Sequence, residues 1–280
     1  MKNVISLFFA FVLSLLPCFS SPVYGGSRAG SVVDVARKDF YDGRYLNALE
    51  GFITGLEMAG ADKDSLSMMA CMGYIGNIYN SFNDNSSSLS YSLAGYDIAC
   101  KCGNADMQGR FLSNIVGTYC RLGNVAKAEE YYALERKVKM KDSVNQDYYL
   151  LYNRARILQA RNELDSALDF HYRTLRFVER NAMGDAYRLV QISEIGNVLV
   201  KLDKYDEALE YGRLCMELSA KLGDDELMIN ALYIMSDAWG GLGRTEETKA
   251  YRAKALSLSD SVFNPVSYTH LRAHETGAYL

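Results

Sequence analysis

The sequence has three prolines, and none lies between Val23 and Asn264. Proline removes a backbone hydrogen-bond donor and breaks helices, so nothing in this stretch forbids long, uninterrupted helices. The same stretch contains no long linker rich in glycine, serine or proline. We therefore predict one continuous helical array rather than several domains joined by flexible segments.

The residues and charges that form metal sites and nucleic-acid surfaces are also scarce. There are three histidines, and none of the six cysteines forms a Cys-x-x-Cys pair, so we expect no metal site. A net charge of −4, with both signs interspersed, provides no basic surface for nucleic acid. Charge runs such as 135–141 are interpreted as solvated helix faces. We interpret the cysteines as packing residues, although export would allow Cys100 or Cys102 to form a disulfide with Cys120.

Catalytic constellations are absent from the pattern as well. His171 falls in register with Phe52 and Tyr132, at a packing position, and no Ser or Cys nucleophile falls near it by register. The acidic pair Asp224 and Asp225 lies at a helix start, where carboxylates complement the helix dipole. We therefore predict that this segment is not an enzyme and needs no cofactor.

What the chain does contain is a repeat with a period near 40 residues. One series of mostly small residues reads Ala48, Ser88, Ala128, Ala167, Ala208 and Thr248. Five residues before each member, a residue suited to positive φ reads Gly43, Asn83, Gly123, Asn162, Asp203 and Gly243. Twelve residues before each member, a third series reads Ala36, Gly76, Val116, Ala155, Gly196 and Ser236. A generic helical bundle would show amphipathic periodicity without this constant spacing.

Each unit is interpreted as two helices joined by a tight turn, with close contact at the small positions. Gly196, Asp203 and Ala208 occupy these positions in the clearest unit, which resembles the tetratricopeptide repeat (TPR). The resemblance implies an all-α TPR-type superhelix (solenoid) of about six helical hairpins. The units are expected near 29–68, 69–108, 109–147, 148–188, 189–228 and 229–264. A period above the usual ~34 residues predicts longer helices or links, and the polar stretch 83–90 predicts a late helix start.

Both ends of the sequence are expected to lie outside the array. Lys2, the apolar run 4–16 and the small residues near Gly25 predict a signal peptide over 1–25. Whether Cys18 is lipidated stays open. Residues 266–276, VSYTHLRAHET, resemble a translated sequencing adaptor. We therefore interpret 265–280 as a non-native tail, and we expect the natural protein to continue differently.

The concave face of a TPR array, lined by the first helix of each hairpin, is the expected binding groove. In TPR proteins that bind extended peptides, Asn and basic residues at such positions hold the peptide backbone and carboxylates. The residues that resemble this set, with neighbouring aromatic and polar positions, are Asn77, Tyr149, Tyr152, Arg156, Ser193, Asn197, Tyr233 and Asp237. The alternative is that they are ordinary polar residues on a wet face.

Two functional classes remain open. The chain resembles the exported TPR sensor segment of bacterial membrane-anchored regulators, which would place it in the periplasm or facing the periplasm from the inner membrane. A missing C-terminal output domain could then bind DNA. The alternative is a stand-alone exported TPR scaffold or lipoprotein that assists assembly of envelope complexes. In both cases the expected partner is a protein or peptide.

Overall fold

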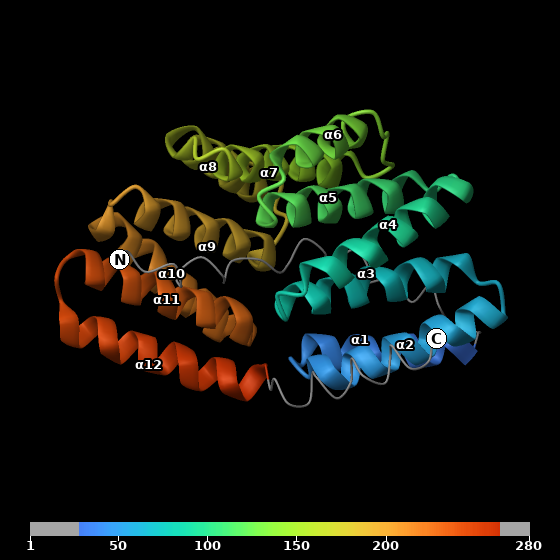
Figure 1. Ribbon diagram of the computed structural model, residues 1–280, viewed down its shortest axis with the longest axis horizontal. Coiled ribbons are helices and arrows are strands. Elements are labelled where there is room, and N and C mark those ends of the chain that lie inside the picture. The colour runs from blue at the N-terminus through green and yellow to red at the C-terminus, as the bar shows by residue number, and fades with distance from the viewer. Residues whose placement is uncertain (1–27, 264–280) are drawn as a thin grey trace.

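The computed structural model describes residues 28–263, and every regular element in that range is an α-helix (Figure 1). The helices are α1 (Arg28–Tyr41), α2 (Tyr45–Ala61), α3 (Ser65–Ser81), α4 (Asn85–Lys101), α5 (Ala105–Arg121), α6 (Val125–Glu135), α7 (Ser143–Ala160), α8 (Leu164–Arg180), α9 (Asp185–Lys201), α10 (Tyr205–Leu222), α11 (Asp225–Gly241) and α12 (Thr245–Val262). Consecutive helices pair as six hairpins. No helix within 28–263 is both long enough and apolar enough to span a membrane.

The turn within each hairpin is built as the repeat predicts. All six turn residues have positive φ, between 58° at Asp203 and 74° at Gly243. The second helix of every hairpin begins two residues after its turn residue. This includes α4, which begins at Asn85, so the expectation of a late start there is wrong. The Asp84 carboxylate accepts a hydrogen bond from the Ser87 amide at 3.1 Å, and this N-cap stabilises the polar start of α4.

The long period comes from long helices, because most helices have 17 or 18 residues. Most links between hairpins are short and also contain residues with positive φ, such as Lys63 and Gly103. The exception is the segment 136–142, which follows the 11-residue helix α6. From the second hairpin onward, the hairpins begin at 65, 105, 143, 185 and 225, four or five residues before the predicted unit boundaries.

The small residues of the repeat lie where helices approach each other. Ala128 and Ala208 are fully buried. A Cβ atom added at Gly76 would lie 3.3 Å from the Ser92 Oγ of its own hairpin. At Gly196 it would lie 2.9 Å from Ile234 Cδ1 in the next hairpin. The register therefore marks close packing both within hairpins and between them.

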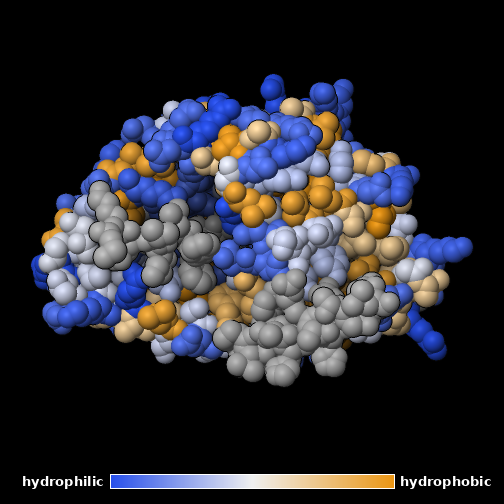
Figure 2. All heavy atoms as spheres, viewed as in Figure 1, coloured by the Kyte–Doolittle hydropathy of each residue, from blue (hydrophilic) through white to orange (hydrophobic). Residues whose placement is uncertain are grey.

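The array curves until its first and last hairpins adjoin, with α12 ending beside α1 and α2 (Figure 1). Phe263, directly after α12, stacks on Tyr45 at the start of α2, with ring centroids 5.8 Å apart. On the face in Figure 2, hydrophilic and hydrophobic residues are interspersed, with hydrophobic residues gathered over α4 to α6. The first helices of neighbouring hairpins contact one another, α5 with α7 and α9 with α11 among them, so they lie on the inner side of this curve.

Candidate functional site

Polar side chains on the first helices of successive hairpins are linked to one another across the array. The Asn114 side-chain amide donates a hydrogen bond to the Asn77 Oδ1 atom at 3.2 Å, joining α5 to α3. The Tyr152 hydroxyl donates to Glu194 at 3.1 Å, joining α7 to α9. We call these residues and their polar neighbours the inner polar face. Its members are Asn77, Asn114, Arg121, Tyr152, Arg156, Ser193, Glu194, Asn197 and Asn230.

Arg156 lies near the middle of this face. It is 4% exposed, and its Nη1 atom donates to the side-chain Oδ1 of Asn153 at 3.1 Å. Its guanidinium lies 5.3 Å from the Tyr152 ring centroid. The absent side chain of Gly117 makes room for it, because a Cβ atom there would lie 1.5 Å from Arg156 Nη2. Glycine at this position of α5 is therefore required for the observed position of the guanidinium.

Arg121, which sequence reasoning missed, is the second guanidinium of the face. It donates to Asn85 at 2.8 Å, to Thr118 at 2.9 Å and to Asn80. Burial, followed by the like charge of Arg156, lowers the pKa of Arg121 to about 9. Arg121 lies one helical turn after Gly117, which occupies the same register position as Asn77, Arg156 and Asn197. Extending that register by one more turn would have found it.

Beside the two guanidinium groups, Tyr152 supplies a hydroxyl donor and Glu194 supplies a negative charge. Burial, followed by the charge of Glu194, raises the pKa of Tyr152 well above its usual value. The hydroxyl therefore stays protonated and donates to Glu194. Glu194 also acts on Arg121 by raising its pKa, although this effect is smaller than burial. Side chains from α5, α7 and α9 thus share one electrostatic environment.

The predicted groove residues divide into three groups. Asn77, Tyr152, Arg156, Ser193 and Asn197 belong to the inner polar face, and the first four are at most 4% exposed. Tyr149 is 1% exposed and packs edge-on against Tyr148, in the hydrophobic core. Tyr233 and Asp237 both face Arg252 of α12, which lies over the Tyr233 ring and 3.8 Å from the Asp237 carboxylate. The structure therefore brings five of the eight together.

Asn197 differs from the other members of the face. The residue is partly exposed, but its Nδ2 atom is buried and has no hydrogen-bond partner within residues 28–263. A buried amide donor without a partner costs about 1–3 kcal/mol. Such groups are rare in folded proteins and call for an explanation, such as a water molecule or ligand. Asn197 is therefore the position on this face that is most suited to an additional acceptor.

The charge run 135–141 is only partly as the sequence suggested. Its basic residues, Arg136, Lys137, Lys139 and Lys141, are exposed, but they lie in the link after α6 and not on a helix. Helix α6 ends at Glu135, which is 2% exposed. Asn153 donates to both Glu135 oxygens, at 2.9 and 2.8 Å, and to Ser113 at 3.0 Å. Burial raises the pKa of Glu135 to about 8, although Asn153 and Arg156 act in the opposite direction. Glu135 is thus part of a buried polar network.

Cys71 and Cys215 are buried packing residues, whereas Cys100 and Cys102 are exposed. No group of three or more His, Cys, Asp or Glu residues is arranged there to hold a metal ion. The five cysteines between 28 and 263 are free thiols, so Cys120 forms no disulfide with Cys100 or Cys102. His171 is fully buried between Gln191 and Gln159, and burial lowers its pKa. The predictions for Cys18, for 1–25 and for 265–280 fall outside the described residues.

No protein-family model and no curated protein matches the sequence. A Rap protein complexed with Competence and Sporulation Factor is similar in structure, with TM-score 0.63 and 11% identity over 84% of this chain and 75% of that chain. BtubC (BKLC) from P. vanneervenii is similar with TM-score 0.51 and 13% identity, over 84% of this chain and 92% of that chain. A Podosopora anserina kinesin light chain with TPR-like repeats aligns with TM-score 0.35 and 13% identity, over 87% of this chain and 99% of that chain.

At these identities the first two likenesses show the fold alone, and the third is too weak to add to them. Together with the six hairpins, they confirm the predicted all-α, TPR-type solenoid.

Proposed function

We propose that this chain binds an extended segment of a protein or peptide along its inner polar face. The observation that carries the proposal is the buried, unpartnered amide donor of Asn197, which lies in register with Arg156. An extended peptide offers a carbonyl acceptor at every residue, and an Asn side chain can both donate to it and accept from it. The bound factor of the structurally similar Rap protein supports a binding role without identifying the ligand.

The two guanidinium groups add a preference for an acidic group on the ligand. Arg121 donates to neutral amides and a hydroxyl among the described residues. The charge of Arg156 disfavours the charged form of Arg121. A carboxylate placed between the two would relieve this repulsion and accept charge-assisted hydrogen bonds. Asn197 is therefore proposed to bind backbone, and the arginine pair to bind an acidic side chain or chain terminus.

The test uses a phage-displayed library of random linear peptides, selected against the purified chain. A selected peptide is then titrated by fluorescence anisotropy against wild type, Asn197→Ala and Gly117→Ala. Asn197→Ala removes an amide that has no internal partner for its Nδ2 atom, so binding should weaken about tenfold, which is ~1.4 kcal/mol, without loss of thermal stability. Gly117→Ala should weaken binding by displacing the guanidinium of Arg156.

Gly109→Ala is the matched control. It lies in the same helix as Gly117, and its added Cβ atom would also meet a flexible side-chain end, Met140 Sδ at 2.4 Å. It leaves the inner polar face untouched, so peptide affinity should stay at the wild-type value. The proposal is wrong if no peptide is enriched over a bare resin, or if Asn197→Ala and Gly117→Ala bind the selected peptide as wild type does.

We also propose, from the sequence pattern at residues 1–25, that the chain is exported and acts as the extracytoplasmic sensory part of a longer regulator. A stand-alone envelope scaffold is the alternative. Cell fractionation of the natural full-length product tests the location. Recovery with the cytosol at its full, uncleaved mass would refute export. A transmembrane segment and an output domain in the full gene would favour the regulator.

A further inference from the structure

The first and last hairpins meet through a small set of side chains that stacking of neighbouring repeats does not require. Glu226, in the first turn of α11, accepts a hydrogen bond from the Ser81 hydroxyl at the end of α3, at 3.0 Å. The Tyr45 hydroxyl approaches the same carboxylate oxygen at 3.5 Å. Phe263 lies between Tyr45 and Phe82, with ring centroids 5.8 and 5.5 Å away. We call these five residues the clasp.

In a solenoid each hairpin is stabilised mainly by its sequence neighbours. The clasp instead joins hairpins one and two to hairpin six, across a sequence separation of 181 residues between Tyr45 and Glu226. Its loss would therefore leave the packing between neighbouring hairpins intact. The array could therefore change its curvature by rigid-body movement of its hairpins, with the clasp open and every hairpin still folded.

The charge at the centre of the clasp is poorly compensated. Glu226 is 9% exposed, and two more acidic side chains precede it, the N-cap residue Asp224 and the first helical residue Asp225. Facing it are the hydroxyls of Ser81 and Tyr45, and, from α5, the charge of Arg121. Burial and then Asp224 raise the pKa of Glu226 to about 8, while Ser81, Tyr45 and Arg121 oppose the shift.

We propose that the clasp is a releasable closure of the array, shut when Glu226 carries a proton and opened when it ionises. The closed ring holds its first and last hairpins together, and the open form is an ordinary solenoid with separated ends. The device goes beyond the proposed peptide binding, because none of the five clasp residues belongs to the inner polar face. It gives the array two curvatures that a ligand or a change of acidity can select between.

The direction of the pH effect follows from proton linkage. Burial raises the pKa of Glu226 in the closed ring relative to an ordinary glutamate, and opening would expose the carboxyl to water and bring its pKa back toward the ordinary value. The stabilisation of the closed form is therefore complete below about pH 4.5 and is lost as pH rises through about 8. The clasp should thus be shut near pH 5 and should open toward pH 9.

The experiment measures Förster transfer between dyes on non-natural amino acids at Glu50 in α2 and Ser257 in α12, both exposed. In the full chain, transfer efficiency should fall between about pH 5 and pH 9, with helicity by circular dichroism unchanged. Glu226→Gln keeps the shape and the acceptor oxygen without the charge, so its transfer should stay high throughout. Phe263→Ala should lower transfer at pH 5, where the wild-type clasp is shut, and so reduce the fall in transfer between pH 5 and pH 9.

Glu135→Gln is the matched control, because Glu135 is also a buried carboxyl with its pKa raised to about 8. It lies in α6, away from the clasp, so its pH-dependent fall in transfer should match wild type. Constant transfer in wild type across this pH range would overturn the proposal. So would a Glu226→Gln chain that still opens with pH, or a Glu135→Gln chain that no longer does.

Discussion

Two junctions between consecutive hairpins are built in opposite ways. In the junction of α10 with α11, Met235 is 1% exposed and its thioether occupies the space that Gly212 leaves, since a Cβ atom there would lie 2.7 Å from Met235 Sδ. Cys215 is fully buried in the same junction. Only two residues, 223 and 224, separate the helices. This junction is apolar and tightly linked.

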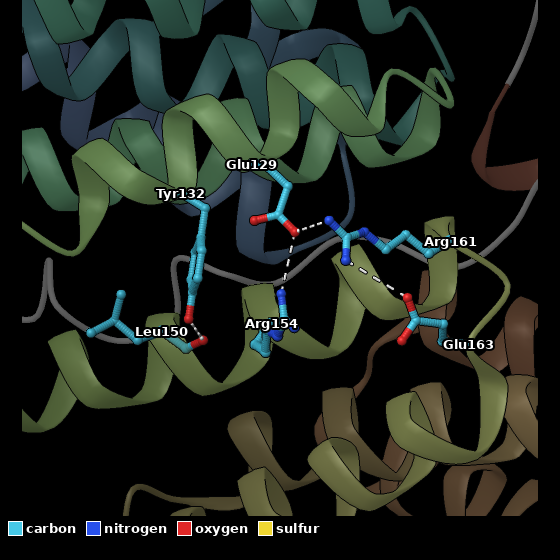
Figure 3. A network of polar contacts seen from close by, with 6 residues as sticks. All are labelled: Glu129, Tyr132, Leu150, Arg154, Arg161 and Glu163. Carbon is cyan, nitrogen blue, oxygen red and sulfur yellow. Dashed lines mark hydrogen bonds and ion pairs between the residues drawn. The ribbon is translucent and has the colours of Figure 1, made fainter.

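The junction of α6 with α7 is polar instead (Figure 3). Glu129 pairs with Arg154 at 3.2 Å and with Arg161 at 2.7 Å, and the Tyr132 hydroxyl donates to the Leu150 carbonyl at 3.1 Å. The ion pairs are about a third exposed, so each contributes little to stability. Helix α6 has 11 residues, and the link that follows covers 136–142.

The difference comes from one register position, seven residues after each small residue of the second helices. It reads Gly55, Gly95, Glu135, Thr174, Cys215 and Ala255, and all six are buried. At Cys215 and Ala255 a compact side chain lets the helix continue. A glutamate at this position needs hydrogen-bond partners when buried, which Asn153 supplies, and helix α6 ends there.

Met235→Ala should have the largest effect, because it removes a buried side chain from the apolar junction. Large-to-small core changes of this kind cost about 2–5 kcal/mol. Urea unfolding followed by circular dichroism measures the loss. Met140→Ala is the matched control, since Met140 is 8% exposed and lies in the link 136–142, and it should cost less. If both variants lost the same free energy of unfolding, the apolar junction would not be packed more tightly than the link 136–142, and the comparison of the two junctions would fail.

Much of the fold was predictable because the repeat residues act locally. A positive-φ residue such as Gly43 fixes the turn, and a small residue such as Ala208 fixes where two helices touch, so both follow from spacing. The late start of α4 was predicted wrongly because the capping power of Asp84 was not weighed against the polar composition after it. The burial of Glu135 was readable from its register with Cys215, but the basic residues that follow it, Arg136 and Lys137, favoured a solvated face.

The candidate site was less predictable, because it depends on how far the array curves. The register found Asn77, Arg156 and Asn197 on one face, since they are separated by whole repeats. It did not separate Tyr233 and Asp237 from that face, because their partner, Arg252, lies on the last helix. The contact of Glu226 with Ser81 depends on the summed rotation from the second hairpin to the sixth. No local pattern in the sequence encodes that sum.

Glu135→Gln tests the polar junction with a smaller expected effect. Because burial raises the pKa of Glu135 to about 8, its contribution to stability is present below about pH 4.5 and is lost as pH rises through about 8. Wild type should therefore lose on the order of 1–3 kcal/mol relative to Glu135→Gln between pH 5 and 8. Urea midpoints at the two pH values measure this difference. The pH effects of the other carboxyl groups cancel in the comparison, because wild type and Glu135→Gln share those groups.

Glu129→Gln is the control on the same helix, because it removes a partly exposed partner of Arg154 and Arg161 rather than a buried carboxyl. Its effect should stay below about 1 kcal/mol and shrink with added salt. If Glu129→Gln cost more than Glu135→Gln gains at pH 8, the exposed ion pairs would hold the junction together. The buried carboxyl would then be incidental, and the contrast with the apolar junction would lie in the surface charges instead.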